Sequence, residues 1–240
     1  MEETRHGPRA EVARAVGAWL AAALRLSIRK RGRAILAIPG GRSVAQPLAR
    51  LAQEDVAWDR VSVLFVDERH LPAGHEERND RATAGFAAAI SDRGLNPYAF
   101  LSAPFVRYNP EAAADRYWDT IRELGGELDV VLLGVGEDGH IASLFPGRAE
   151  LALNRVGVTA VRNAPKPPPE RITMTPGLIA TATWTCLLFF GEGKRTAYNA
   201  FQDAGLPVER CPAKLSRSAP YLLIAADTAA AGTDTDGRIY

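Results

Sequence analysis

Apolar residues recur along this chain in two alternating patterns. Short continuous apolar runs, which are typical of buried strands, are separated by longer segments whose apolar residues recur at helical spacing. The expected strands are residues 33–38, 61–66, 129–133, 155–161, 184–190 and 221–225. The expected helices are residues 9–29, 43–53, 79–90, 111–124, 172–182 and 194–204.

This alternation predicts an α/β fold, with an open, mostly parallel sheet that carries helices on both faces, as in Rossmann-like proteins. The unbroken apolar strands agree, because strands covered on both faces have no polar side. We expect the 240 residues to form a single domain. The small, polar segment 229–240 is expected to be a mobile tail.

Composition excludes several classes of function. The net charge of +1 gives no reason to expect binding to nucleic acid or to a membrane, and no apolar run approaches the roughly 18 residues of a membrane span. The first 14 residues are polar and do not resemble a signal peptide, so we expect a cytoplasmic protein. No two histidines have metal-ligand spacing on a helix, so a metal is not expected. We expect no cofactor either.

Four loops rich in glycine or charge follow four of the expected strands. They are residues 39–43, 67–69, 134–140 and 191–194. Because ligands of open parallel sheets bind at the carboxyl ends of the strands, these loops are expected to share one edge and to form a site together.

The loop at residues 134–140 places two carboxylates and an imidazole on a turn that contains Gly134, Gly136 and Gly139. It formally matches the G-x-G-x-x-G dinucleotide fingerprint, but its acidic residues would face the pyrophosphate, and the proline at 146 ends any helix early. A glycine turn with solvated carboxylates is a second interpretation. We prefer a catalytic pair of Asp138 and His140, since histidine transfers protons near neutral pH.

The first loop, Gly40-Gly41-Arg42-Ser43, has three interpretations. Its backbone N–H groups at the start of a helix can bind phosphate, and Ser43 can cap the helix. The loop also approaches the G-x-S-x-G nucleophile elbow of serine hydrolases. Phosphate binding is the interpretation we favour.

Charged residues at the other strand ends extend the candidate site. Asp67 and Arg69 end an apolar strand, either as a surface salt-bridge cluster or as part of a polar ligand site. Arg171 and Lys194 are each expected to open a helix, where a cation opposes the helix dipole unless an anion lies nearby. Each could also be a solvated surface charge.

Several motifs carry a resemblance when taken in order. They are Ile-Pro-Gly-Gly at 38–41, Val-Asp-Glu-Arg at 66–69 with the later Asn79, the segment 132–146, Arg-Ile-Thr-Met-Thr at 171–175 and Gly-Lys at 193–194. In these motifs the chain resembles 6-phosphogluconolactonases, within the wider glucosamine-6-phosphate isomerase/6-phosphogluconolactonase family. The resemblance extends from about residue 9 to 230. The segment 132–146 is its most specific part.

The resemblance also distinguishes between activities within the family. Deaminating isomerases carry Asn-Glu-Pro where this chain has Leu144-Phe145-Pro146. Phenylalanine cannot transfer a proton, which favours lactone hydrolysis. In the first loop Gly-Gly-Ser-Thr-Pro is common in the lactonases, and the different residues here leave the contribution of Arg42 open.

The activity implied by the resemblance is hydrolysis of 6-phospho-D-glucono-1,5-lactone, a step of the oxidative pentose phosphate pathway. His140 is the expected general base, with Asp138 orienting it or contacting substrate. Arg69 would stabilise the oxyanion and Asp67 would bind hydroxyls. The expected phosphate ligands and glycine contacts are Gly40, Gly41, Arg42, Ser43, Gly136, Arg171 and Lys194. We expect a monomer or a small homo-oligomer.

Three alternatives stay open from the sequence. They are a glucosamine-6-phosphate deaminase, a serine esterase that uses Ser43, and a non-catalytic sugar-phosphate-binding protein.

Overall fold

A seven-stranded parallel sheet forms the centre of the molecule. The computed structural model describes residues 1–94, 96 and 99–232, apart from the side chain of Arg42. The strand order is β1-β10-β9-β6-β2-β3-β5, and every neighbouring pair is parallel. The strands are β1 (Glu2–Gly7), β2 (Ala34–Ile38), β3 (Val61–Phe65), β5 (Phe100–Leu101), β6 (Val130–Gly134), β9 (Trp184–Phe189) and β10 (Tyr221–Asp227).

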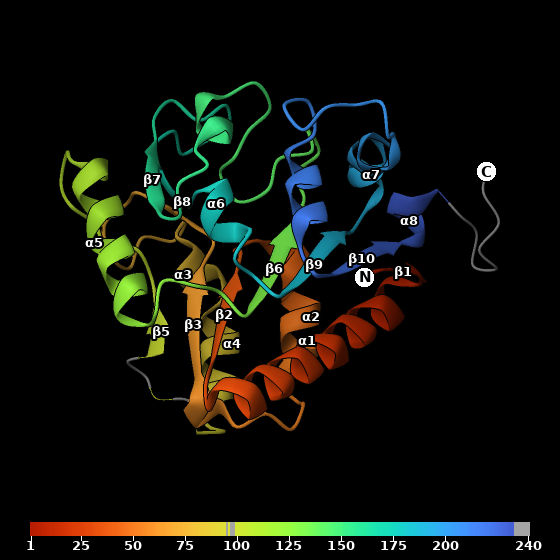
Figure 1. The fold of residues 1–240 in the computed structure, drawn as a ribbon, viewed down its shortest axis with the longest axis horizontal. Helices are drawn as coiled ribbons and strands as arrows, with labels where there is room; N and C mark the ends of the chain where they lie inside the picture. Colours follow the sequence, from red (N-terminus) through yellow and green to blue (C-terminus); the bar gives the residue numbers. More distant parts are fainter. Residues whose placement is uncertain (95, 97–98, 233–240) are drawn as a thin grey trace.

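Helices cover both faces of this sheet (Figure 1). They are α1 (Arg9–Arg31), α2 (Ala45–Leu51), α3 (Asn79–Ala82), α4 (Ala84–Ser91), α5 (Pro110–Glu123), α6 (Pro176–Ile179), α7 (Arg195–Gln202) and α8 (Thr228–Ala231). None of the helices in the described part of the chain combines the length and the apolar character of a membrane span.

Two hydrophobic cores follow from the alternation of side chains along each strand. In β2, Ile35 and Ala37 belong to the core that includes α5, α6 and α7. Leu36 and Ile38 point the other way, into the core that includes α1, α2 and α4. Since successive side chains of a strand face opposite sides, the unbroken apolar strands serve both cores. The predicted α/β fold is confirmed.

A second, smaller sheet lies beside the carboxyl edge of the first. It has the order β4-β8-β7, with β4 (Asp67–Arg69), β8 (Arg171–Met174) and β7 (Val158–Val161), and both pairings are antiparallel. The strand β4 follows β3 after a single residue, so the small sheet begins where a strand of the large sheet ends.

The helix expected at residues 172–182 is wrong. Residues 171–174 form the central strand of the small sheet, and only the short helix α6 follows. Thr173 and Thr175 are β-branched and favour extended backbone. Thr175 then caps α6 by accepting a hydrogen bond from the Leu178 amide at 3.2 Å. Arg171 therefore lies in a strand, not at the start of a helix.

Other differences from the predicted elements are smaller. The helix expected at 79–90 is divided into α3 and α4 at Thr83. The one expected at 43–53 begins with a 3₁₀ turn and ends at Leu51. The strands β1, β4 and β5 were not expected. Of the tail expected to be mobile, residues 229–231 belong to α8, and Ala230 is buried; residues 233–240 lie outside the described residues.

Gly17 lies at a close contact between two helices, whereas Gly85 faces open space. A Cβ atom on Gly17 of α1 would lie 2.7 Å from Arg50 Cβ and 2.9 Å from the Leu51 nitrogen of α2. A Cβ atom on Gly85 of α4 would meet nothing within 4 Å, because Gly85 lines the groove between α2 and α4. The contact of α1 with α2 thus requires glycine at position 17.

We expect Gly17→Ala to lower the free energy of unfolding by roughly 1–3 kcal/mol, because the added methyl group overpacks the contact between α1 and α2. Gly85→Ala is the matched control, because its added methyl group meets open space. This change replaces glycine by a residue of higher helix propensity and should raise the free energy of unfolding by up to about 1 kcal/mol. Urea unfolding of the two variants measures both effects. An equal gain in stability from both substitutions would contradict the close approach.

Candidate active site

A cleft of about 820 Å³ lies at the carboxyl edge of the central sheet. All four loops that were expected to meet contribute to it, which confirms that they share one edge. Its lining residues are Arg9, Gly40, Gly41, Ser43, Arg69, Gly134, Val135, Gly136, Glu137, His140, Lys166, Phe190, Gly191, Gly193 and Lys194. The chain runs outward from β2 to β3 on one side and from β6 to β9 on the other (Figure 1). The cleft therefore lies at the topological switch point of the sheet.

A tight turn after β6 presents the catalytic candidates. The Gly136 amide donates to the His140 carbonyl at 2.8 Å, and the Gly139 amide donates to the Gly136 carbonyl at 3.0 Å. Gly139 has a φ of +82°, which favours glycine. A Cβ atom on Gly136 would lie 2.0 Å from His140 Nδ1. These two glycines allow the imidazole to fold back over its own loop.

The imidazole of His140 is bonded to the carboxylate of Asp138. The distance from His140 Nδ1 to Asp138 Oδ1 is 2.5 Å. An ionised carboxylate only accepts hydrogen bonds, so the proton of a neutral imidazole resides on Nδ1 and Nε2 is left as the basic nitrogen. The predicted pair is therefore brought together in a geometry suited to general base chemistry.

Nearby charges keep Asp138 ionised. Burial alone would raise its pKa, but the hydrogen bond from His140 and the charges of His140 and Lys166 hold the pKa of Asp138 well below its usual range. The Lys166 ammonium lies 3.3 Å from Asp138 Oδ1. Asp138 thus remains an acceptor at any pH at which the protein would work.

Phe145 supports the imidazole from beneath. The two ring centroids are 4.6 Å apart, and Phe145 is buried. The guanidinium of Arg171 lies 5.7 Å from the centroid of the same phenyl ring. An apolar surface therefore occupies the position next to the base, with no proton-transfer group on it.

Arg69 reaches the cleft from β4 and is fixed by buried polar groups. The buried carboxylate of Glu68 accepts from the Arg69 amide at 2.7 Å and from the Asn79 amide at 2.7 Å. Burial raises the pKa of Glu68, while these hydrogen bonds and the charge of Arg78 oppose that rise. The Nε atom of Arg69 is buried and has no hydrogen-bond partner among the described residues.

The opposite wall carries Lys194 and Arg9. Lys194 is half-buried, and burial lowers the pKa of its ammonium; the Lys166 charge acts in the same direction, whereas Glu137 raises it. Arg9 donates from Nε to Asp227 Oδ2 at 2.8 Å. Among the described residues, the cleft lining thus carries five basic side chains, Arg9, Arg69, His140, Lys166 and Lys194, and one carboxylate, Glu137.

The first glycine loop adjoins these groups. A Cβ atom on Gly40 would lie 2.0 Å from Asn79 Oδ1, so Asn79 requires glycine there. Gly40, Gly41 and Ser43 all line the cleft. The predicted role of Arg42 falls on a side chain outside the described part of the structure.

Asp67 and Arg171 do not line the cleft. Asp67 accepts hydrogen bonds from Asn79 Nδ2 at 3.0 Å and from Ser143 Oγ at 2.6 Å. Arg171 donates to main-chain carbonyls in the segment that carries Lys166, and its Nη1 is 3.8 Å from Asp67 Oδ2. Both residues are buried beneath the site, and their direct contact with a substrate stays a prediction.

Sequence reasoning did not assign Lys166, Arg9 or Glu137 to the site. Lys166 is one of four lysines in the chain, and this scarcity was the only signal that pointed to it. Arg9 is the first residue of a long amphipathic helix and had no distinguishing feature. Glu137 belonged to the recognised loop but was not given a role.

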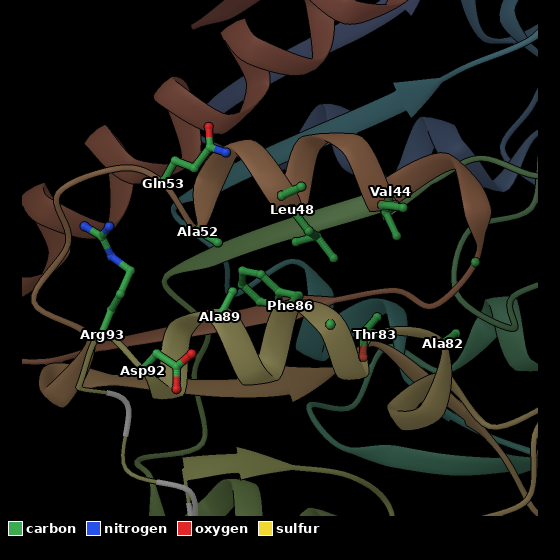
Figure 2. Close-up of a pocket in the computed structure, with 14 residues that line it drawn as sticks. Val44, Leu48, Ala52, Gln53, Ala82, Thr83, Phe86, Ala89, Asp92 and Arg93 are labelled. Carbon is green, nitrogen blue, oxygen red and sulfur yellow. The ribbon is translucent and has the colours of Figure 1, made fainter.

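A second cavity differs in character. The groove between α2 and α4 has a volume of about 580 Å³, and Leu48, Ala52, Phe86 and Ala89 face one another across it (Figure 2). Its charged lining residues are Asp92 and Arg93, at one end. No histidine is among the described residues that line the groove, so the cleft beside His140 is the candidate active site.

Comparisons with known proteins identify the family of this chain. The family described as glucosamine-6-phosphate isomerases/6-phosphogluconolactonase matches residues 8–222. A 6-phosphogluconolactonase from Mesorhizobium japonicum is 37% identical over 80% of this chain and 81% of its own length. The corresponding protein from Pseudomonas aeruginosa is 34% identical over 81% and 82%. In the crystal structure of a putative 6-phosphogluconolactonase from Neisseria gonorrhoeae, the fold matches with a TM-score of 0.74 at 25% identity, over 95% of this chain and 100% of that one.

This chain aligns with only part of the length of some longer relatives. The alignment spans 62% of a probable chloroplastic 6-phosphogluconolactonase from Oryza sativa, at 33% identity. The family match covers nearly all of the described residues and includes every loop of the cleft. The chain therefore belongs to the glucosamine-6-phosphate isomerase/6-phosphogluconolactonase family.

Proposed function

We propose that the chain hydrolyses 6-phospho-D-glucono-1,5-lactone to 6-phospho-D-gluconate. The observation that carries this proposal is the imidazole of His140, which is oriented by Asp138 and faces a cleft rich in basic side chains. Such a cleft suits an anionic substrate, and the oriented imidazole suits activation of water. The names of the relatives at 34–37% identity support the same reaction.

In the proposed reaction, His140 Nε2 takes a proton from a water molecule as its oxygen bonds to the lactone carbonyl carbon. Asp138 stabilises the imidazolium that forms. The tetrahedral intermediate then collapses by breaking the bond to the ring oxygen. That oxygen leaves as a hydroxyl group and receives the proton from the imidazolium.

Basic groups would bind the charged parts of the substrate. Arg69, which projects from β4, is the proposed donor to the oxyanion that develops at the carbonyl. The amides of Gly40, Gly41 and Ser43, together with Lys194, are the proposed phosphate ligands. Anchoring the phosphate would hold the carbonyl in reach of the base.

The buried pair beneath the site has a supporting role in this proposal. Asp67 joins β4 to Ser143, and Arg171 ties down the segment at Lys166. These contacts support a role in shaping the cleft.

Phe145 argues against the deaminase alternative. Its phenyl ring packs against the imidazole, where the deaminases that the sequence resembles carry a glutamate. A monomeric glucosamine-6-phosphate deaminase has the same fold, with a TM-score of 0.78, but only 18% identity, which is evidence of fold alone. Carbon-bound proton transfer would require a second acid–base group at this position.

The remaining alternatives have less support. The hydroxyl of Ser43 has no hydrogen bond to a histidine among the described residues, and His140 is bonded to Asp138. A sensor would have no need for an oriented base. The cytoplasmic location and the oligomeric state stay predictions.

The substitution His140→Asn should lower kcat for the phosphorylated lactone by about 10²–10⁴-fold, the usual contribution of a general base. The measurement is initial-rate hydrolysis, with spontaneous hydrolysis subtracted and folding checked by circular dichroism. His6→Gln is the control, because His6 is an exposed histidine of the edge strand β1. Near-normal turnover by folded His140→Asn would eliminate His140 as the base.

Activity should also depend on pH with a single acidic limb between pH 5 and 8. Only a neutral imidazole accepts a proton, and histidine is the side chain that ordinarily changes its charge within this pH range. Because the pKa of Asp138 is held low by its partners, the carboxylate stays ionised over this range and adds no second limb. A kcat that is flat from pH 5 to 8 would show that no histidine acts as the base.

A further inference from the structure

Lys166 approaches the catalytic pair from a segment remote in sequence. Its Nζ lies 3.3 Å from Asp138 Oδ1, the same oxygen that His140 Nδ1 contacts at 2.5 Å. The side chain of Lys166 is 41% exposed, and it lines the cleft. One carboxylate oxygen is therefore shared between an ammonium group and the candidate base.

The backbone at Lys166 is fixed from below. Arg171 donates from Nη2 to the carbonyls of Lys166 at 3.1 Å and Pro167 at 2.9 Å, and from Nε to that of Pro168 at 3.1 Å. The Ala164 amide closes the same segment by donating to the Pro169 carbonyl at 2.9 Å. Burial lowers the pKa of Arg171, opposed by the charge of Asp67. Three hydrogen bonds from one buried guanidinium therefore restrict the backbone conformation of the segment that carries Lys166.

We propose that Lys166 is a positioning residue for the Asp138–His140 pair. Its ammonium holds the shared carboxylate oxygen in line with Nδ1, and its charge opposes a second positive charge on the imidazole. Lys166 thereby acts on the base through Asp138 and favours the neutral imidazole that accepts a proton. The consequence for turnover rests on the proposed function; the effect on the imidazole does not.

The competing role for Lys166 is direct binding of the substrate. A lysine ammonium has three donors, and the contact with Asp138 uses one of them. A pure binding role would appear in KM, whereas positioning of the base appears in kcat and in the protonation of the imidazole. The two roles are therefore separable by measurement.

Other charged groups surround the imidazole and must stay constant in any test. Those that line the same cleft, or lie behind the supporting phenyl ring, are Arg9, Arg69, Glu137, Lys194 and Arg171. Substitution at Lys166 leaves all of them in place, so a change at the imidazole reports the loss of this one ammonium.

The test compares Lys166→Met, Lys166→Arg and Lys30→Met with the unaltered protein. Lys30 lies in the last turn of α1, away from the cleft, and its substitution removes an equal charge. For each protein, kcat and KM are measured with the phosphorylated lactone, and the His140 imidazole is titrated by NMR.

For Lys166→Met we expect kcat at neutral pH to fall about tenfold, the lower end for loss of a hydrogen bond to a charged group. KM should stay within roughly twofold. The titration midpoint of the His140 imidazole should rise by roughly 0.5 pH unit, because both the repulsion and the competition for Asp138 are lost. Lys166→Arg should keep both kcat and the imidazole midpoint close to those of the unaltered protein, and Lys30→Met should change neither quantity.

Two results would overturn the inference. One is an unchanged imidazole midpoint in Lys166→Met, and the other is a raised KM with an unchanged kcat, which would make Lys166 a binding residue. If the unaltered protein does not hydrolyse the lactone, the proposed function fails, while the NMR titration still decides the role of Lys166.

Discussion

The hydrogen bond from the Gly136 amide to the His140 carbonyl closes the turn on which the rest of the cleft depends. With this turn closed, the imidazole lies over its own loop, where a side chain at position 136 would overlap it. Asp138 is then within reach of Nδ1 at 2.5 Å, which leaves Nε2 as the ring nitrogen that can accept a proton. The packing of Phe145 against the ring fixes the remaining orientation.

The small antiparallel sheet links this turn to the other parts of the site. Its strand β4 carries Arg69 into the cleft, and β8 carries the buried Arg171. Asp67 connects the same sheet to the residues after the turn by accepting from Ser143. Buried polar groups of this kind cost free energy unless every partner is present. The network therefore specifies one arrangement of the loops. A substitution within it should alter the position of His140, although the network itself does not contact substrate.

The sequence allowed the central sheet and most of its edge to be predicted, because buried parallel strands leave unbroken apolar runs. It also located Asp138 and His140, since glycine, carboxylate and imidazole rarely come together on a loop after a strand. The strand β1 was missed because an exposed edge strand with charged side chains has no hydrophobic pattern. The strand β8 was mistaken for a helix, since its apolar residues continue into α6. Lys166 could not be placed, because its contact with Asp138 spans 28 residues and depends on the path that Arg171 imposes.

Hydrolysis of a phosphorylated sugar lactone is the activity that we propose for this cleft. The most direct measurement is kcat/KM of the unaltered protein for 6-phospho-D-glucono-1,5-lactone and for the lactone without phosphate, with spontaneous hydrolysis subtracted from both. We predict hydrolysis of the phosphorylated lactone with at least about a hundredfold preference, since two or more charge-assisted phosphate contacts would each contribute roughly 1.5–3 kcal/mol. Equal rates for the two lactones, or no hydrolysis above the spontaneous rate, would contradict it.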